Sequence, residues 1–290
     1  MSAKIIKGMP IAEEIRKEIL AESEELQKKG VQPKLAVLLV GGDPASVWYA
    51  RSKVKVGDKV GVKVELTEMA EDTPQEKVIE FIEKLNNDKD THGILVELPL
   101  PKHIDKTKVM NAIKPEKDVD GVTAVNRGYI FGGQEDLALV PATPLSCIEL
   151  IERSGIELVG KRVALLGRGD TVGRPLASLL ITRHATITVC HTRTVDIPSI
   201  TRNAEIIVAA AGKRNLVTKD MVSPGTVVID AGINEITKED GSTGIVGDVD
   251  FENVKEVASA ITPVPGGVGS LTTSIIMKNV LKAIKLQGLA

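Results

Sequence analysis

The sequence has little aromatic character and little net charge. Phenylalanine, tryptophan and tyrosine make up 2% of its 290 residues, which leaves few rings on which nucleic-acid bases could stack. The formal net charge is only −2, so no strong positive field favours nucleic acid or an anionic membrane. We therefore expect neither nucleic acid nor a membrane as a partner, and we expect a core built from aliphatic side chains.

Cysteine is limited to Cys147 and Cys190. Two distant thiols make neither a disulfide framework nor a zinc site, so the sequence predicts no metal site and favours a reducing compartment. Long apolar runs are missing too: the amino-terminal segment is charged and helix-periodic, and no later run approaches the ~20 apolar residues of a membrane span. The expectation is a cytoplasmic protein.

The chain does contain a regular alternation of apolar runs and amphipathic segments. Several runs are almost continuously apolar, as expected of parallel strands covered on both faces. The alternation predicts an α/β fold of two domains, each a mostly parallel sheet with flanking helices. The strand candidates span 34–40, 62–69, 93–100, 162–167, 186–191, 205–212, 226–233 and 258–264, and the helical segments lie near 10–29, 44–59, 74–88, 143–154, 171–182 and 270–286. The polar, glycine-containing stretch 126–144 is the expected boundary between the domains.

The segment "VALLGRGDTVGRPLASLL" has the order strand, glycine-rich turn, helix. Gly167, Gly169 and Gly173 form G-x-G-x-x-x-G, one residue longer than the usual dinucleotide fingerprint. Such glycines let the backbone turn tightly and approach a pyrophosphate at the amino terminus of the helix. An ordinary βα turn is the alternative, but the flanking strand and helix favour a Rossmann-type dinucleotide site.

The end of the next strand indicates which dinucleotide is bound. NAD-preferring sites usually place Asp or Glu there, whereas this sequence has His191, Thr192 and Arg193. With no acid to repel a 2′-phosphate, Arg193 and Arg168 could bind it through charge-assisted hydrogen bonds. NADP is therefore favoured over NAD, although either arginine taken alone could equally be a solvated surface charge.

A second polar cluster surrounds the segment "SVWYARSK". Ser46, Tyr49 and Lys53 are three and four residues apart, which places them on one side of a helix. Glu97 is the only charged residue of "GILVELPLP". An acid near the carboxyl end of a buried strand is expected to face a ligand site, because ligands bind at that edge of a parallel sheet.

These motifs stand in the order found in the methylenetetrahydrofolate dehydrogenase/cyclohydrolase family, which the chain resembles over essentially its full length. They are Y-x-x-x-K at 49–53, "GILVELPLP" at 93–101, "KDVDG" at 117–121, "TP" at 143–144, "GRGDTVGRP" at 167–175, "DAGIN" at 230–234, "GDVDF" at 247–251 and "TPVPGGVG" at 262–269. Each motif is short, but eight in order are highly specific.

The resemblance implies both architecture and activity. It implies a homodimer whose subunits have a folate-binding catalytic domain, 1–140 plus 271–290, and an NADP-binding Rossmann-type domain, 141–270, with the folate cleft between them. The implied reactions are the NADP-dependent oxidation of 5,10-methylenetetrahydrofolate to 5,10-methenyltetrahydrofolate and its hydrolysis to 10-formyltetrahydrofolate. Both belong to one-carbon metabolism and serve purine biosynthesis.

The resemblance also implies roles for single residues. Tyr49 would lie against the flat part of the folate, Lys53 would be the catalytic lysine of hydrolysis, and Asp120 would accept hydrogen bonds from the pterin. A solvated helix lysine and a turn-capping aspartate are the plainer alternatives for the last two. The other residues implied to bind folate are Val96, Glu97, Leu98, Pro265, Gly266, Gly267 and Gly269. Those implied to bind NADP are Gly167, Arg168, Gly169, Val172, Gly173, His191, Thr192, Arg193 and Ile233.

The sequence departs from the family pattern at Glu97, where glutamine is usual, and at Gly169, where serine is usual. A carboxylate beside Lys53 would hold the amine protonated, which disfavours its use as a base, or would itself act as the base. We hypothesise that hydrolysis is therefore altered or weakened relative to oxidation.

Three other interpretations stay open. They are a dehydrogenase-only member of the family, possibly linked to NAD; a folate- or nucleotide-binding protein without turnover; and a general two-domain NADP oxidoreductase. The last of these fits the glycine turn alone, since a fold does not fix a function, and it leaves "KDVDG" and "TPVPGG" unexplained.

Overall fold

The computed structural model describes residues 2–42, 44–237 and 241–290. The chain divides into two compact units: unit 1 comprises Met1–Ala12 and Thr143–Thr272, and unit 2 comprises Glu13–Ala142 and Thr273–Ala290. Residues 1–12 belong to unit 1 rather than to the half of the chain with which we grouped them, because β1 (Lys4–Ile5) pairs in parallel with β11 (Ala260–Ile261). The predicted α/β fold with mostly parallel sheets is confirmed.

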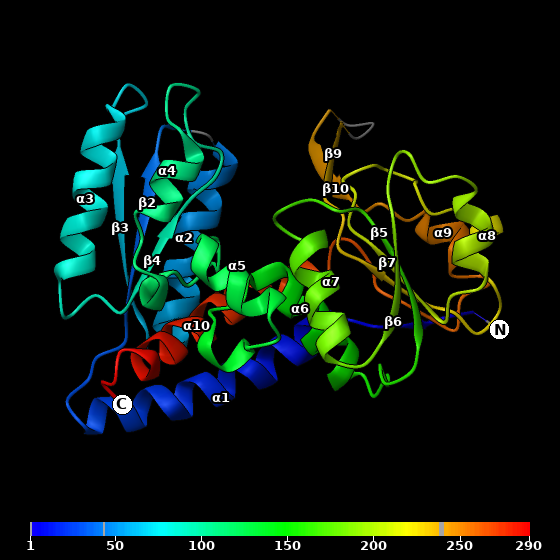
Figure 1. The fold of residues 1–290 in the computed structure, drawn as a ribbon, viewed down its shortest axis with the longest axis horizontal. Helices are drawn as coiled ribbons and strands as arrows, with labels where there is room; N and C mark the ends of the chain where they lie inside the picture. Colours follow the sequence, from blue (N-terminus) through cyan, green and yellow to red (C-terminus); the bar gives the residue numbers. More distant parts are fainter. Residues whose placement is uncertain (1, 43, 238–240) are drawn as a thin grey trace. The chain divides into compact units, whose positions relative to one another are not determined.

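Unit 1 is built on a six-stranded sheet in the order β1-β11-β8-β7-β5-β6, of which Figure 1 labels β5, β6 and β7. Every pair in this sheet is parallel. Its other strands are β5 (Arg162–Leu166), β6 (Thr186–Cys190), β7 (Ile206–Ala209) and β8 (Val227–Asp230), and its helices include α6 (Ala142–Arg153), α7 (Gly173–Thr182), α8 (Ile197–Arg202) and α9 (Phe251–Val254). An antiparallel hairpin of β9 (Asn234–Thr237) and β10 (Thr243–Val246) extends the unit. Because β6 and β7 flank β5 on opposite sides, the strand order reverses at β5, and ligands of such sheets bind outside the carboxyl ends of the strands at that point.

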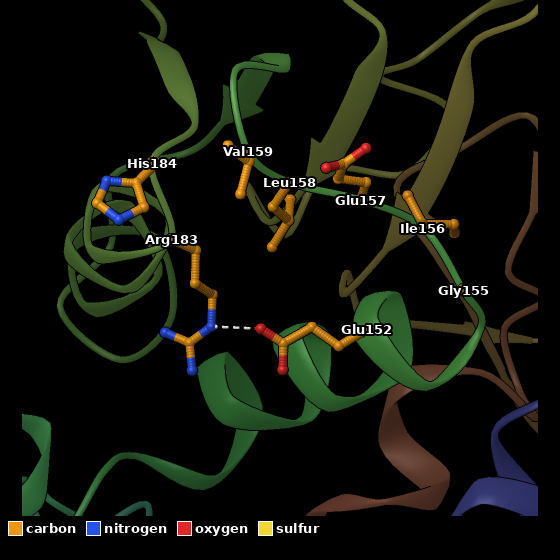
Figure 2. Close-up of a pocket in the computed structure, with 8 residues that line it drawn as sticks. All are labelled: Glu152, Gly155, Ile156, Glu157, Leu158, Val159, Arg183 and His184. Atoms are coloured by element: carbon orange, nitrogen blue, oxygen red, sulfur yellow. Dashed lines mark hydrogen bonds and ion pairs between the residues drawn. The ribbon is translucent and has the colours of Figure 1, made fainter.

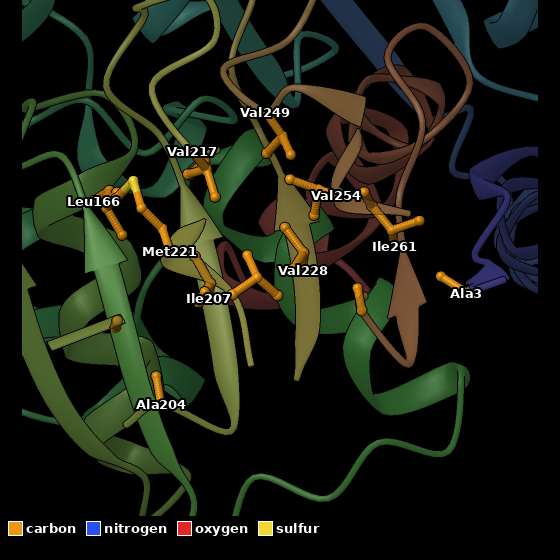
Figure 3. Packing of buried hydrophobic residues seen from close by; sticks show 14 of the residues in the cluster. Ala3, Leu166, Ala204, Ile207, Val217, Met221, Val228, Val249, Val254 and Ile261 are labelled. Atoms are coloured by element: carbon orange, nitrogen blue, oxygen red, sulfur yellow. The ribbon is translucent and has the colours of Figure 1, made fainter. Parts of the chain in front are cut away.

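The core of unit 1 follows from the register of its strands. Ala164, Ile207, Val228 and Ile261 occupy directly paired positions on four neighbouring strands, so their side chains lie on one face of the sheet. Figure 3 shows this buried cluster, to which Met221 and other aliphatic side chains from the connections contribute. The near-continuous apolar runs in the sequence therefore mark strands buried on both faces.

Unit 2 has a three-stranded parallel sheet in the order β3-β2-β4 (Figure 1). The strands are β2 (Lys34–Val40), β3 (Lys63–Met69) and β4 (Gly93–Val96). The helices are α1 (Gly8–Lys28), whose first residues belong to unit 1, α2 (Pro44–Val60), α3 (Gln75–Asn87), α4 (Lys106–Asn111), α5 (Ala124–Phe131) and α10 (Thr272–Leu286). Helix α2 follows β2, so its amino-terminal part lies at the carboxyl edge of this sheet.

The last helix is an integral part of unit 2. Nine residues of α10 are buried, among them Asn279. The Asn279 side-chain amide donates hydrogen bonds to the backbone oxygens of Val119, at 2.7 Å, and Val140, at 2.8 Å. Two carbonyls that would otherwise be buried without a donor are satisfied in this way.

Strand and helix ends differ from the expectation where proline and short helices intervene. The run 93–100 forms a strand only as far as Val96, because Pro99 and Pro101 have no N–H to donate to a sheet. The expected boundary stretch 126–144 contains most of α5, whose amino terminus is capped by the Thr123 hydroxyl. Over the described ranges, no helix combines the length and the apolarity needed to cross a bilayer.

Candidate functional site

Helix α2 is fixed to the segment after β4 at two points one turn either side of Tyr49. The Ser46 hydroxyl donates to the backbone oxygen of Leu98 at 3.0 Å, and the Lys53 ammonium donates to Glu97 Oε1 at 2.6 Å. The spacing of three and four residues in the sequence thus serves to hold one face of α2 against the carboxyl end of β4, with Tyr49 between the two contacts.

The Lys53–Glu97 pair is buried and the aromatic side chains beside it are not. Lys53 is 5% exposed and Glu97 8%, whereas Tyr49 is 37% and Trp48 66% exposed. The Lys53 Nζ atom lies 5.8 Å from the centroid of the Tyr49 ring, within the range of a cation–π contact. The Trp48 ring meets the Tyr49 ring edge-on, with centroids 5.2 Å apart. An accessible aromatic surface therefore borders a desolvated ion pair.

Asp120 completes this cluster and has an unusual acidity. Burial of its carboxyl group raises the pKa of Asp120 to about 7, the neighbouring Asp118 and Glu97 act in the same direction, and Lys53 opposes them. At neutral pH the side chain therefore exchanges between its charged and its neutral form. A carboxyl group with that property in a polar cluster is a candidate for ligand binding or proton transfer.

The two other polar residues of "KDVDG" have structural roles that the sequence did not reveal. Asp118 is fully buried and accepts hydrogen bonds from the backbone of Val122 and Thr123 and from the Asn126 side chain. Lys117 donates to the backbone oxygens of Leu85, in the last turn of α3, and of Asp88, just after it. Both therefore shape the loop that carries Asp120. Their partners are mainly backbone groups, which leave no signal in the sequence.

The glycine-rich turn of unit 1 borders a cavity of about 470 Å³ at the carboxyl ends of β5, β6 and β7. Gly167 has φ +115°, and a Cβ there would lie 2.2 Å from the backbone oxygen of Ala210, so only glycine fits. A Cβ at Gly169 would meet no described atom within 4 Å, which leaves the backbone open to the cavity. This close, unobstructed main chain at the start of α7 fits the pyrophosphate of a dinucleotide.

The cavity brings together most, but not all, of the predicted cofactor residues. Gly167, Arg168, Gly169, His191 and Thr192 line it. Among the residues that the structure describes, the other four predicted ones lie outside this lining: Val172, Gly173, the exposed Arg193 and the exposed Ile233. The sequence did not predict the remaining lining residues, which are Leu166, Cys190, Ile197, Ala210, Ala211, Lys213 and Leu216.

Two buried aspartates hold the loops on this edge of the sheet. Asp230, the last residue of β8, accepts hydrogen bonds from the backbone of Gly232, Asp248 and Val249. Asp248 accepts hydrogen bonds from three successive backbone N–H groups, at 211–213, and from the Asn234 side chain. Burial raises the pKa of Asp230 to about 6 despite these donors. The motifs "DAGIN" and "GDVDF" thus jointly hold the loops at this edge of the sheet in place.

The proline- and glycine-rich loop lies in unit 1. The Gly8 N–H donates to the backbone oxygen of Gly266, and a Cβ at Gly267 would lie 2.5 Å from the backbone oxygen of Pro263. Pro265 and Gly269 belong to the same loop, which leads into α10. In unit 2, the Val96 side chain is buried in the hydrophobic core, so only its main-chain groups are available to a ligand, and the half-buried Leu98 side chain packs against the same core.

A second cavity, of about 370 Å³, lies next to the segment between α6 and β5 (Figure 2). Arg183 donates to Glu152 there at 2.7 Å, and apolar side chains from 156–159 form part of the lining. It is at the amino end of the sheet, the opposite edge from the expected ligand site. In the described part of the chain, no three His, Cys, Asp or Glu side chains are grouped to hold a metal ion.

Comparison with known proteins extends these observations. The family model "Tetrahydrofolate dehydrogenase/cyclohydrolase, catalytic domain" matches residues 6–120, and the "NAD(P)-binding domain" model of the same family matches 141–288. The chain is 57% identical over 285 residues to the bifunctional protein FolD 2 of Desulfitobacterium hafniense, with 98% of each chain covered. The structure of the bifunctional enzyme FolD of Campylobacter jejuni gives a TM-score of 0.94 at 40% identity, over 99% of this chain and 100% of that one. The Trypanosoma brucei enzyme, in complex with NADP and an inhibitor, gives 0.93 at 38% identity over 100% of both chains.

Proposed function

Because the chain belongs to the tetrahydrofolate dehydrogenase/cyclohydrolase family, we propose that it is a bifunctional enzyme of one-carbon metabolism. It oxidises 5,10-methylenetetrahydrofolate with NADP and hydrolyses the resulting 5,10-methenyltetrahydrofolate to 10-formyltetrahydrofolate. The observation that carries this proposal is the presence, in one chain, of the buried Lys53–Glu97 pair beside Tyr49 and of the glycine-lined cavity.

The cofactor cavity supports NADP as the oxidant. When bound, NADP supplies the carbon that accepts a hydride. The chain would hold it through the main chain of Gly167 and Gly169 and through Arg168, His191 and Thr192, all of which line the cavity. The protein has to position the substrate rather than transfer protons in this step, because the folate nitrogen stabilises the developing cation.

Hydrolysis, unlike hydride transfer, requires acid–base chemistry from side chains, which we place in unit 2. We assign Tyr49 to orient the flat part of the folate and Asp120 to accept hydrogen bonds from the pterin. Lys53 and Glu97 are the groups that activate water and move its proton. The Lys53 ammonium already donates to the Glu97 carboxylate at 2.6 Å, so both groups must leave this contact to act on water, which supports slower hydrolysis than oxidation in this chain.

A spectrophotometric assay tests the proposal. Purified protein is given 5,10-methylenetetrahydrofolate with NADP or with NAD, and both nucleotide reduction and the methenyl intermediate are followed. We expect faster reduction of NADP than of NAD, with transient accumulation of the methenyl compound. Preferential reduction of NAD would instead favour an NAD-linked enzyme, and tight folate binding without any reduction would indicate a binding protein without turnover.

We also propose that the enzyme is a cytoplasmic homodimer whose product serves purine biosynthesis. The two free, buried cysteines suit a reducing compartment, and the net charge of −2 gives no reason to expect nucleic acid as a partner. Light scattering coupled to size-exclusion chromatography tests the dimer. A mass that stays at the 30.9 kDa of one chain at all concentrations would contradict it.

A further inference from the structure

The lining of the cofactor cavity includes a positively charged residue that lies outside the glycine-rich turn. Lys213 lies in the loop after β7 and lines the cavity together with Arg168. Within the described ranges, neither cation has a carboxylate at ion-pair distance, and the cavity lining contains no described Asp or Glu. Two uncompensated positive charges on one concave surface attract an anion.

The loop that carries Lys213 is fixed rather than free. The backbone N–H groups of Ala211, Gly212 and Lys213 all donate to the Asp248 carboxylate, at 2.7 to 2.9 Å. Asp248 is fully buried, and Asn234 donates to it as well at 2.9 Å. Charge-assisted bonds of this kind are strong, so the start of the lysine side chain has a defined place at the cavity edge.

We propose that Lys213 binds the 2′-phosphate of NADP as the second cation beside Arg168. The inference rests on the proposed use of NADP and names the residue that makes the chain prefer it over NAD. Arg193, to which the sequence gives this role, lies outside the described lining of the cavity, whereas Lys213, equally exposed, belongs to that lining.

We assign Lys213 to the 2′-phosphate because the pyrophosphate of NADP already has a binding site on the main chain. The open main chain of the glycine-rich turn, at the start of α7, serves the pyrophosphate. The end of the second strand of a dinucleotide fold is where the adenosine ribose is recognised. His191 and Thr192 occupy that place here and share the cavity with Lys213.

The test is direct binding of two small probes to the full-length protein. Adenosine 2′,5′-bisphosphate and AMP differ only in the 2′-phosphate, and calorimetric titration measures both. Lys213→Met removes the ammonium and keeps a long side chain. We expect it to weaken binding of the bisphosphate about tenfold or more, as loss of a charge-assisted hydrogen bond does, and to change AMP binding by less than about twofold.

Arg214→Met is the matched control, because it removes the same charge from the same loop at a residue outside the described lining of the cavity. It should leave the preference for the bisphosphate within about twofold of the parent protein. Equal weakening of both probes by Lys213→Met would assign the lysine to the 5′-phosphate and overturn the inference. Unchanged binding, or the same loss in Arg214→Met, would overturn it too. No folate takes part, so this result is independent of whether the turnover assay succeeds.

Discussion

Asp120 should make folate binding depend on pH. Its pKa is raised to about 7, so the carboxylate, to which we assign the hydrogen bonds of the pterin, is progressively lost as the pH falls below 7. We expect the KM for 5,10-methylenetetrahydrofolate to be constant above pH 8 and to rise below pH 7, by at most about tenfold per pH unit. Steady-state kinetics from pH 6 to 8.5 measure this.

Asp120→Asn is the control for this titration. The amide keeps the size of the side chain but cannot change its charge, so the KM of the variant should be higher and independent of pH. A KM of the parent protein that stays constant between pH 6 and 8 would contradict the assigned role of Asp120.

Glu97 should control the balance between the two reactions. In Glu97→Gln the hydrogen bond to Lys53 can remain, but the ion pair that engages the lysine in the parent protein is gone. We expect hydrolysis to accelerate relative to oxidation by about tenfold, within the usual range of acid–base effects. Because Glu97 also raises the pKa of Asp120, the rise in KM for folate should move to lower pH.

The measurement is the pH–rate profile of methenyltetrahydrofolate hydrolysis. Glu80→Gln removes an equal charge from an exposed ion pair with Lys77 on α3 and should leave the profile as it is. Identical profiles for the parent protein and Glu97→Gln would show that the acid does not govern hydrolysis.

At the level of single residues, the sequence could predict partners that share a helix face or a sheet edge. Strand polarity places Lys53 and Glu97 at the same sheet edge, the family resemblance implies their contact, and the structure contains it. Asp118 and Asp248 were not predicted because most of their partners are backbone N–H groups. Such partners are set by the path of the loops, which spacing along the sequence does not encode.

At the level of elements, Asp230 should make the stability of the β8 edge depend on pH. Its folded-state pKa of about 6 lies above the roughly 3.9 of an unfolded aspartate. The folded state therefore binds the proton more tightly, and the Asp230 contribution to stability is fully present below pH 4 and declines as the pH rises through 6. The total change is about 3 kcal/mol.

Asp230→Asn isolates this contribution. An amide has one acceptor oxygen for three backbone donors, so we expect the variant to be less stable at pH 5 by about 1–3 kcal/mol. It does not titrate, so the difference in free energy of unfolding from the parent protein should shrink between pH 5 and 7. Urea denaturation followed by circular dichroism measures both proteins. A difference that is constant across this range would contradict the assigned pKa.

Helices and strands were predictable from the sequence where their apolar pattern extended over many residues. All eight strand candidates contain a strand and all six helical segments contain a helix. The short helices α4, α8 and α9 were not predicted because four to six residues carry little periodicity. The hairpin β9–β10 was missed for a similar reason, since its strands have four residues each.

At the level of the whole molecule, neither compact unit is a continuous piece of chain. The polypeptide passes from one unit to the other after Ala12, Ala142 and Thr272. The alternation of strands and helices predicted two parallel sheets, but it did not reveal that β1 joins the sheet of unit 1. A two-residue strand carries no pattern of its own, and only its pairing with β11 defines it.

The discontinuity leads to a prediction about fragments. A fragment of residues 13–142 lacks α10, which contributes nine buried residues to unit 2 and donates to two of its buried carbonyls. We expect this fragment to show no cooperative unfolding in urea, followed by the fluorescence of Trp48, the single tryptophan of the chain. Addition of a peptide of residues 273–290 should restore the transition, because it resupplies the missing part of the core.

The same peptide with Asn279→Leu should restore it less well, since the carbonyls of Val119 and Val140 would stay without their donor. Cooperative unfolding of the fragment alone would mean that α10 only covers a core that is already complete.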